Sequence, residues 1–169
     1  MFDRRQQINL LGALVCFGMF GYALYAEKFL GFVPCPLCMF QRVCIVALGI
    51  VFLIAGLHRV RRAGGIVYAA LIFLAAGAAT WVAGRHVWIQ HQPPGTVPAC
   101  GATLDFMLDV FPVTEVIRKV LTGSGECGKV DWRFLGFAMP VWVLISFVVL
   151  GVTGVVNNWR RVRSGPSFR

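Results

Sequence analysis

Four long apolar stretches dominate this sequence and limit what the chain can fold into. They run from Ile8 to Tyr25, from Met39 to Leu57, from Ile66 to Gly84 and from Phe137 to Val156. Each is close to the roughly 20 residues that an α-helix needs to cross about 30 Å of hydrocarbon. Hydrophobic residues make up 58% of the chain and charged residues 14%, a balance outside the range of soluble domains. The pattern predicts an all-α membrane protein, in which residues 1–169 form one domain, a four-helix transmembrane bundle.

Basic residues are unevenly distributed between the segments that the spans separate. The two termini and the segment 58–65 carry nine basic residues against one acidic residue, whereas the other side, with the segments 26–38 and 85–136, carries seven basic against six acidic residues. Basic residues accumulate on the cytoplasmic side of membrane proteins. We therefore expect both termini in the cytoplasm, with a short outer loop at 26–38 and a long one at 85–136. The net charge of +9 then reports orientation in a membrane, and we expect no binding of nucleic acid.

A further helix is expected in the long outer loop. After Pro112, apolar residues recur at helical spacing opposite polar ones: Val113, Val116, Ile117, Val120 and Leu121 against Thr114, Glu115, Arg118 and Lys119. Gly123 marks the end of this pattern. It predicts a short amphipathic helix, which we expect in the outer membrane interface. The alternative is a surface helix that packs on its own loop.

The six cysteines divide by position. Two lie in the short outer loop, two in the long one and two inside spans: Cys35 and Cys38, Cys100 and Cys127, Cys16 and Cys44. The span cysteines are most simply small apolar fillers. The four outer thiols suit either structural disulfides or redox chemistry on an oxidising face. A zinc centre built from all four is not expected, because 61 residues separate Cys38 from Cys100 and 26 separate Cys100 from Cys127, whereas zinc modules offer two close pairs.

Cys35 and Cys38 form a Cys-x-x-Cys directly before the second span. If Pro36 occupies the first helical turn, Cys35 lies near the helix N-terminus, where the dipole and the free N–H groups stabilise a thiolate. Arg42 lies four residues after Cys38, on the same helix face and one turn deeper. From its position alone, Arg42 is either an interfacial arginine that reaches for water or a cation that supports thiolate character at Cys38.

Several short motifs in fixed order resemble the disulfide bond formation protein B family, DsbB. They are Pro34-Cys35-Pro36-Leu37-Cys38 followed by Gln41-Arg42, then His86 and Gln90 before Cys100, then Gly125-Glu126-Cys127, and Trp132-Arg133-Phe134-Leu135-Gly136 leading to Met139-Pro140. The resemblance covers most of the chain. Relatives of vitamin K epoxide reductase share the architecture, but they carry their loop cysteines before the Cys-x-x-Cys, which is the opposite order.

The resemblance implies a quinone-dependent protein-dithiol oxidoreductase of the bacterial inner membrane with its active cysteines in the periplasm. A DsbA-like periplasmic thiol oxidase would attack Cys100 of a Cys100/Cys127 disulfide, and the electrons would pass to the Cys35/Cys38 pair. Cys38, as a thiolate, would deliver them to membrane quinone, either ubiquinone or menaquinone.

The resemblance also implies contacts to the quinone from Arg42 and, with a weaker case, from His86. We expect no metal at the site. Two other interpretations are a membrane scaffold whose two disulfides brace its loops and a conduit that sends reducing power outward. The conduit is disfavoured, because Cys16 and Cys44 are isolated in separate spans and form no pair that the cytoplasm can reach.

Overall fold

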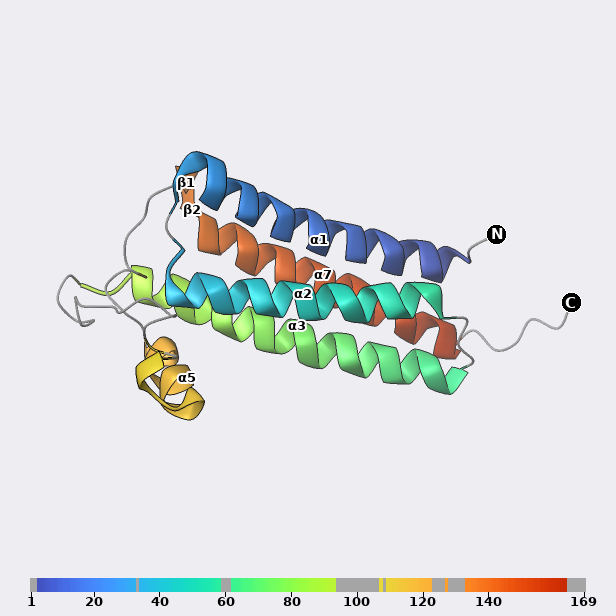
Figure 1. The fold of residues 1–169 in the computed structure, drawn as a ribbon. Helices are drawn as coiled ribbons and strands as arrows, with labels where there is room; N and C mark the ends of the chain where they lie inside the picture. Colours follow the sequence, from blue (N-terminus) through green and yellow to red (C-terminus); the bar gives the residue numbers. More distant parts are fainter. Residues whose placement is uncertain are drawn as a thin grey trace, which may run out of the picture.

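Four long helices lie side by side in the computed structural model, which describes residues 3–32, 34–58, 62–93, 107, 109–122, 127 and 133–163 (Figure 1). They are α1 (Arg4–Leu30), α2 (Pro36–Leu57), α3 (Arg62–Gln90) and α7 (Met139–Arg163). Each contains a stretch that is long and apolar enough to cross a membrane. The expected four-helix transmembrane bundle is confirmed.

The helices are longer than the apolar stretches that predicted them. α1 continues to Leu30, where Gly31 ends it with a left-handed conformation at φ 70°. Most of the segment expected as a loop at 26–38 is therefore helical, because α1 ends at Leu30 and α2 begins at Pro36. α3 likewise continues to Gln90, past the expected end of the third span. These extra turns place Glu27 and His86 on helices rather than on loops.

The fourth span begins two residues later than expected. Phe137 and Ala138 form β2, which pairs antiparallel with β1 (Arg133–Phe134), with Phe134 opposite Phe137. Leu135 and Gly136 connect the strands with φ angles of 51° and 84°. A two-residue hairpin turn of this kind needs positive φ at both positions, which ends any continuous helix there. α7 therefore starts at Met139.

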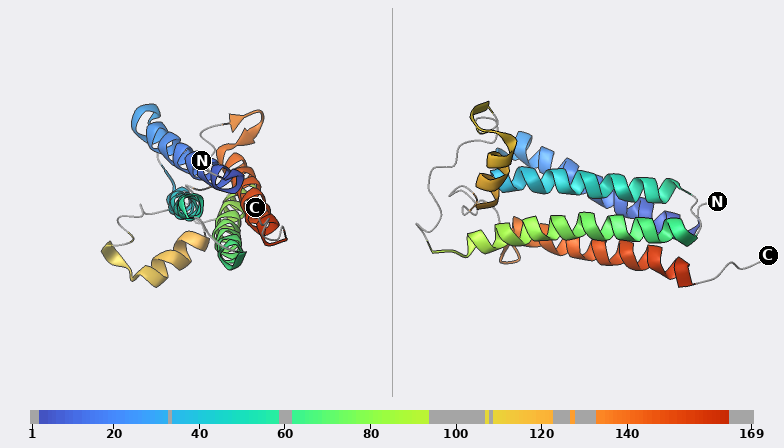
Figure 2. Two further views of the ribbon diagram at one scale, coloured as in Figure 1. Left: turned by 90° about the vertical axis from the view of Figure 1, so that its right-hand side faces the viewer. Right: turned by 90° about the horizontal axis from the view of Figure 1, so that it is seen from below.

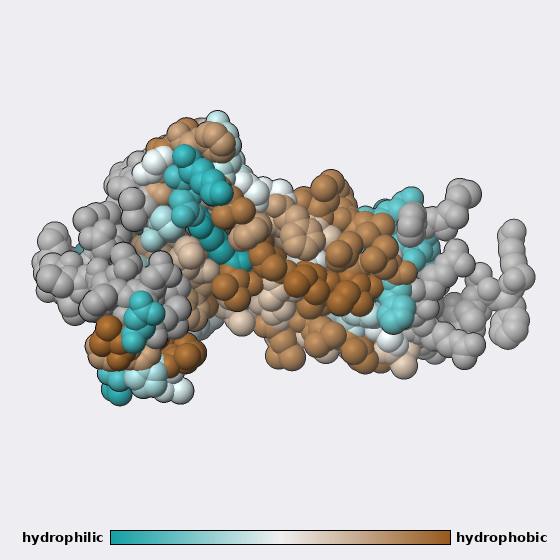
Figure 3. All heavy atoms as spheres, viewed as in Figure 1, coloured by the Kyte–Doolittle hydropathy of each residue, from teal (hydrophilic) through white to brown (hydrophobic). Residues whose placement is uncertain are grey.

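Two pairs of helices make up the bundle. α3 packs most extensively on α7 and α1 on α2, while α2 joins the pairs through α3 (Figures 1 and 2). The centre is filled by large apolar side chains and small ones that allow close approach: Phe52, Phe147, Leu48, Ile72, Ala76, Ala79 and Cys16. Cys16 is fully buried here, as expected of an apolar filler. Outward-facing apolar side chains form the band between two polar ends in Figure 3, the surface that a lipid bilayer solvates.

Polar side chains join three helices at the end of the bundle that holds both termini. The Arg5 guanidinium donates to Asn158 Oδ1 at 3.0 Å and to the carbonyl oxygens of Ala55 and His58, where α2 ends. Asn9 exchanges hydrogen bonds with Asn158. Arg5 was counted among the basic residues of the N-terminal tail, but α1 begins at Arg4 and only 5% of Arg5 is exposed. It satisfies helix-end carbonyls that have no partner within their own helix.

Gly154 of α7 faces Phe52 of α2 and Ile72 of α3, and replacing it with alanine should destabilise the bundle. A Cβ at Gly154 would lie 2.6 Å from Phe52 Cε1 and 2.9 Å from Ile72 Cγ2. Forcing an extra carbon into a packed core lowers the free energy of unfolding by about 1–3 kcal/mol. The melting temperature in detergent should fall for Gly154→Ala. Gly77→Ala is the matched control, because open space surrounds that position; equal melting temperatures for the two variants would contradict the prediction.

The expected amphipathic helix is present as α5 (Val113–Thr122), beside the end of the bundle opposite the termini (Figure 1). Its inward residues Val116 and Val120 are buried against Leu37, Val82 and other residues of that end. Val113 and Ile117 remain exposed. One face of α5 thus packs on protein, and lipid contact by the other face stays a prediction that spin-label depth measurements at positions 113 and 117 would test.

Candidate functional site

The first turn of α2 is built around the Cys-x-x-Cys. Cys35 is the N-cap residue of α2, and Pro36 occupies the first helical position, where its missing N–H costs nothing. The Cys35 sulfur accepts a hydrogen bond from the backbone N–H of Cys38 at 3.3 Å. The expected position of the motif at a helix N-terminus is confirmed. We call the end of the bundle that carries Cys35, Cys38, His86 and Cys127 the cysteine end.

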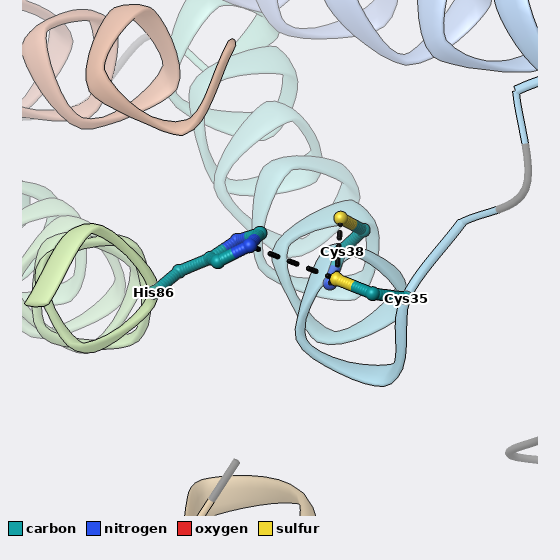
Figure 4. A group of neighbouring side chains, drawn as sticks. All are labelled: Cys35, Cys38 and His86. Carbon is teal, nitrogen blue, oxygen red and sulfur yellow. Dashed lines mark hydrogen bonds between the residues drawn. The ribbon is translucent and has the colours of Figure 1, made fainter. Parts of the chain in front are cut away.

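Three sulfur atoms gather at the cysteine end. The Sγ atoms of Cys35 and Cys38 are 2.7 Å apart (Figure 4). A hydrogen bond with the side chain of Cys127, a second with Cys38 and burial together raise the pKa of Cys35 well above its ordinary value. These contacts favour the thiol form of Cys35, and the thiolate expected at that position stays a prediction. The helix N-terminus favours a charge there, but two neighbouring sulfurs and a dry environment oppose it.

His86 connects the two cysteine-bearing segments from α3. Its Nε2 lies 3.7 Å from Cys35 Sγ and 3.2 Å from the carbonyl oxygen of Cys127. On the other side of the ring, Gln41 Nε2 lies 3.2 Å from Nδ1. With Gln41 donating to Nδ1, the ring proton is on Nε2 and is donated to Cys127. Only 2% of His86 is exposed, so these contacts replace solvent and fix the ring.

Arg42 is held against the end of α1. It forms an ion pair with Glu27, and its second terminal nitrogen donates to the carbonyl oxygen of Ala23 at 3.0 Å. The side chain is 15% exposed. Arg42 is thus a largely buried cation with a partner, not an arginine that extends into water. Glu27 supplies that partner because α1 continues three residues beyond it.

A cavity of about 450 Å³ opens beside these residues. It lies between α1, α2, α3 and α7, and Cys35 and Cys38 both line it. Most of the lining is apolar, with residues such as Phe20, Ile45, Trp142, Val143 and Phe147. The polar part of the wall consists of Glu27, Gln41, Arg42, His86, Gln90 and Ser146 together with the two cysteines. This combination, a mostly apolar cavity with a few convergent polar groups, is typical of a small-molecule site.

Five of the site residues expected from the sequence meet at the cysteine end: Cys35, Cys38, Arg42, His86 and Cys127. The sixth, Cys100, lies outside the described residues. Sequence reasoning missed Gln41 and Glu27. Gln41 follows Cys38 by three residues, so helical periodicity placed it on the cysteine face of α2. Glu27 gave no such signal, because it was assigned to a loop.

Comparison with known proteins agrees with this arrangement. The family model "Disulfide bond formation protein DsbB" matches residues 5–157. A protein of Xylella fastidiosa (strain 9a5c) named "Disulfide bond formation protein B" is 44% identical over 164 residues, covering 94% of this chain and 92% of its own. Proteins of the same name from Xanthomonas euvesicatoria pv. vesicatoria (strain 85-10) and Xanthomonas campestris pv. campestris (strain 8004) are 45% and 46% identical. These cover 92% and 89% of this chain, and 91% and 88% of their own lengths. The match includes all or most of each of the four helices and the described cysteines Cys35, Cys38 and Cys127, and the chain therefore belongs to the DsbB family of disulfide bond formation proteins.

Proposed function

We propose that this chain reoxidises a DsbA-like dithiol protein by thiol-disulfide exchange through two cysteine pairs and passes the electrons to membrane quinone. Its role is then to sustain disulfide bond formation in exported proteins. The observation that carries the proposal is the order of the sulfur atoms. Cys127 contacts Cys35, Cys35 lies 2.7 Å from Cys38, and Cys38 lines an apolar cavity.

Thiol-disulfide exchange requires the attacking sulfur to approach the disulfide it opens. The partner's dithiol attacks the Cys100/Cys127 disulfide at Cys100, leaves as its own disulfide and reduces both loop cysteines. Cys127 then attacks Cys35 of the Cys35/Cys38 disulfide, and Cys38 departs as a thiolate. Closing Cys100/Cys127 again leaves two electrons on the Cys35/Cys38 pair. The contact between Cys127 and Cys35 supports this order of attack.

The cavity fits a quinone by size and by chemistry. Its 450 Å³ falls in the range of cavities that hold small molecules, and its lining is mostly apolar. Arg42 and His86 supply polar groups on the wall near Cys38. A quinone accepts two electrons and two protons, which restores the Cys35/Cys38 disulfide. Because DsbA is itself a strong oxidant, an acceptor of still higher potential is needed, and a quinone meets that need.

The charge distribution supports an orientation for the proposal. Nine basic residues against one acidic residue belong to the termini and the segment 58–65. α1 begins and α2 ends at the end of the bundle opposite Cys35 and Cys38. The positive-inside rule puts that end in the cytoplasm and the cysteine end in the periplasm of a bacterial inner membrane. A soluble partner then meets Cys100 and Cys127 in an oxidising compartment.

Purified protein tests the proposal directly. Reduced DsbA and a soluble quinone are mixed with the protein in detergent, and quinone absorbance is followed. We expect catalytic quinone reduction that is lost when Cys35, Cys38, Cys100 or Cys127 is replaced by alanine. A scaffold braced by two disulfides would show no turnover at all. Turnover that survives loss of any one of the four cysteines would refute the relay.

Glu27 should influence quinone use through Arg42. Glu27→Ala removes the ion pair that holds Arg42, and exposed or half-exposed pairs of this kind contribute about 0.2–1 kcal/mol, so the KM for quinone should rise up to about fivefold. Glu27→Gln keeps an oxygen that accepts the arginine N–H and should change KM by less than about twofold. Initial rates over a series of quinone concentrations measure both. An equal increase in the two variants would show that charge, not the hydrogen bond, holds Arg42.

A further inference from the structure

Three atoms of metal-ligand type converge at the cysteine end. The sulfurs of Cys35 and Cys38 and Nε2 of His86 all lie within 4.8 Å of one another. Figure 4 shows the two cysteines on the first turn of α2 and the imidazole of His86 reaching toward them from α3. Cys35 and His86 are buried, and Cys38 is partly exposed to the cavity.

We propose that the reduced Cys35/Cys38 pair binds Zn²⁺ together with His86, and that the ion blocks electron transfer from these thiols. Zinc prefers sulfur and nitrogen ligands in tetrahedral geometry, with catalytic-type sites using three protein ligands and an open fourth position. The open position here faces the cavity that Cys35, Cys38 and His86 line.

Zinc binding needs two local changes: Nε2 of His86 gives up its contact with the carbonyl oxygen of Cys127, 3.2 Å away, and the two sulfurs move apart. Tetrahedral zinc sets two sulfur ligands about 3.8 Å apart and a sulfur and a nitrogen ligand about 3.5 Å apart. Cys35 Sγ and His86 Nε2 are already 3.7 Å apart. The two sulfurs, at 2.7 Å, must separate by about 1 Å, which rotation of the Cys38 side chain toward the cavity provides. The Cys-x-x-Cys spacing is itself one that zinc sites use.

Charge also favours the ion. Two thiolates, a neutral imidazole and Zn²⁺ sum to zero, so the loaded site places no net charge in a poorly hydrated environment. Binding releases the two thiol protons and transfers no electrons. Gln41 supports the imidazole from behind: with its amide turned, Oε1 accepts the proton that moves to Nδ1 when Nε2 binds metal.

This site differs from the four-cysteine centre that the spacing argued against. It takes one cysteine pair and a histidine 48 residues after Cys38, which come together only because α2 and α3 pack side by side. It is also tied to redox state, because closing the Cys35/Cys38 disulfide removes both sulfur ligands. Zinc would therefore bind the reduced protein and not the oxidised one. Metal binding needs no quinone chemistry, whereas the expected inhibition rests on the proposed function.

Zinc titration of the full-length protein in detergent tests the site. The protein is reduced with a phosphine, freed of quinone and titrated with Co²⁺, whose sulfur-to-metal absorption reports thiolate ligands, and Zn²⁺ then displaces the cobalt. We expect about one Zn²⁺ per reduced chain and none at comparable concentration in the oxidised chain. His86→Ala and Cys38→Ser should each weaken Zn²⁺ binding more than about tenfold. His91→Ala and Cys44→Ala, which change a histidine and a cysteine outside the cluster, should not.

Equal zinc binding by oxidised and reduced protein would overturn the proposal, as would wild-type affinity in both His86→Ala and Cys38→Ser. X-ray absorption of the zinc-loaded wild type gives a readout that needs no variant: two sulfur and at least one nitrogen ligand are expected, and an all-sulfur shell would contradict the assignment. Zn²⁺ should also inhibit quinone reduction, with recovery on adding a chelator. If the proposed function itself is wrong, no turnover is seen before any zinc is added, so this failure is distinguishable from failure of the zinc proposal.

Discussion

Replacing Cys38 with alanine should abolish quinone reduction, by about a thousandfold or more, because it removes the only partner with which Cys35 can form the Cys-x-x-Cys disulfide. The proposed electron path ends at Cys38, whose sulfur lies 2.7 Å from Cys35 and lines the apolar cavity. Quinone absorbance in the presence of reduced DsbA measures the loss. The loop cysteines should still accept electrons once, since Cys38 takes no part in that first exchange.

The Cys38→Ala variant should also form a new disulfide. With Cys38 gone, the Cys35 thiol has Cys127 as its neighbouring sulfur, so mild oxidation should link these two residues. Non-reducing peptide mapping would detect a disulfide between the fragments that carry Cys35 and Cys127.

Cys44→Ala is the matched control for Cys38→Ala, because it removes a thiol from the same helix six residues further along. Cys44 is partly buried against apolar residues of the bundle centre and of the cysteine end, and it was expected to be a filler, so its replacement should preserve turnover. Turnover within tenfold of wild type in Cys38→Ala would refute the assignment of Cys38. A Cys38→Ala protein that forms no link between Cys35 and Cys127 would instead refute the order of attack.

The bundle could be predicted from the sequence because its cause is local. A run of about 20 apolar residues is sufficient reason for a membrane-spanning helix. The ends of the helices were predicted less accurately, because polar residues such as Glu27 and His86 can continue a helix when neighbouring helices provide partners for them. Arg5 shows the same limit. Because it is charged, Arg5 was assigned to the tail. In the structure it is buried and donates hydrogen bonds to carbonyl groups at the end of α2 and to the side chain of Asn158.

The candidate site could likewise be predicted only in part from the sequence. Spacing along one helix placed Cys35, Cys38 and Arg42 together, because residues three and four apart share a face. The contact of Cys127 with Cys35 and the bonds of His86 to both segments depend on how α2, α3 and the long loop pack. No local pattern carries that information, and the resemblance to a family supplied what spacing could not. The rise in the pKa of Cys35 likewise follows from these tertiary contacts, which its place at a helix N-terminus does not reveal.

Arg42→Ala should raise the KM for quinone by about 10- to 100-fold, the cost of losing a charge-assisted hydrogen bond in a largely dry site. The guanidinium lines the cavity, is 15% exposed and is held in place by Glu27 and the carbonyl oxygen of Ala23. Arg42→Lys keeps the charge but has a single terminal nitrogen in place of the two that bind Glu27 and the carbonyl oxygen of Ala23. Its KM should lie between those of the wild type and the alanine variant. Steady-state rates at varied quinone concentration give these values.

The reaction with the protein partner distinguishes two possible roles of Arg42, a contact to the quinone and a general structural role. In the proposed relay, Cys100 and Cys127 react with the partner before Cys38 and the quinone are involved, so single-turnover oxidation of reduced DsbA by Arg42→Ala should keep its wild-type rate. Arg85→Ala is the control for charge, because Arg85 is also at the cysteine end of α3 but packs over the ring of Trp88, at 4.3 Å, and is not among the residues that line the cavity. Its quinone KM should be that of the wild type. An unchanged KM in Arg42→Ala would remove Arg42 from the quinone site, and an equal rise in Arg85→Ala would reduce its effect to net charge at that end of the bundle.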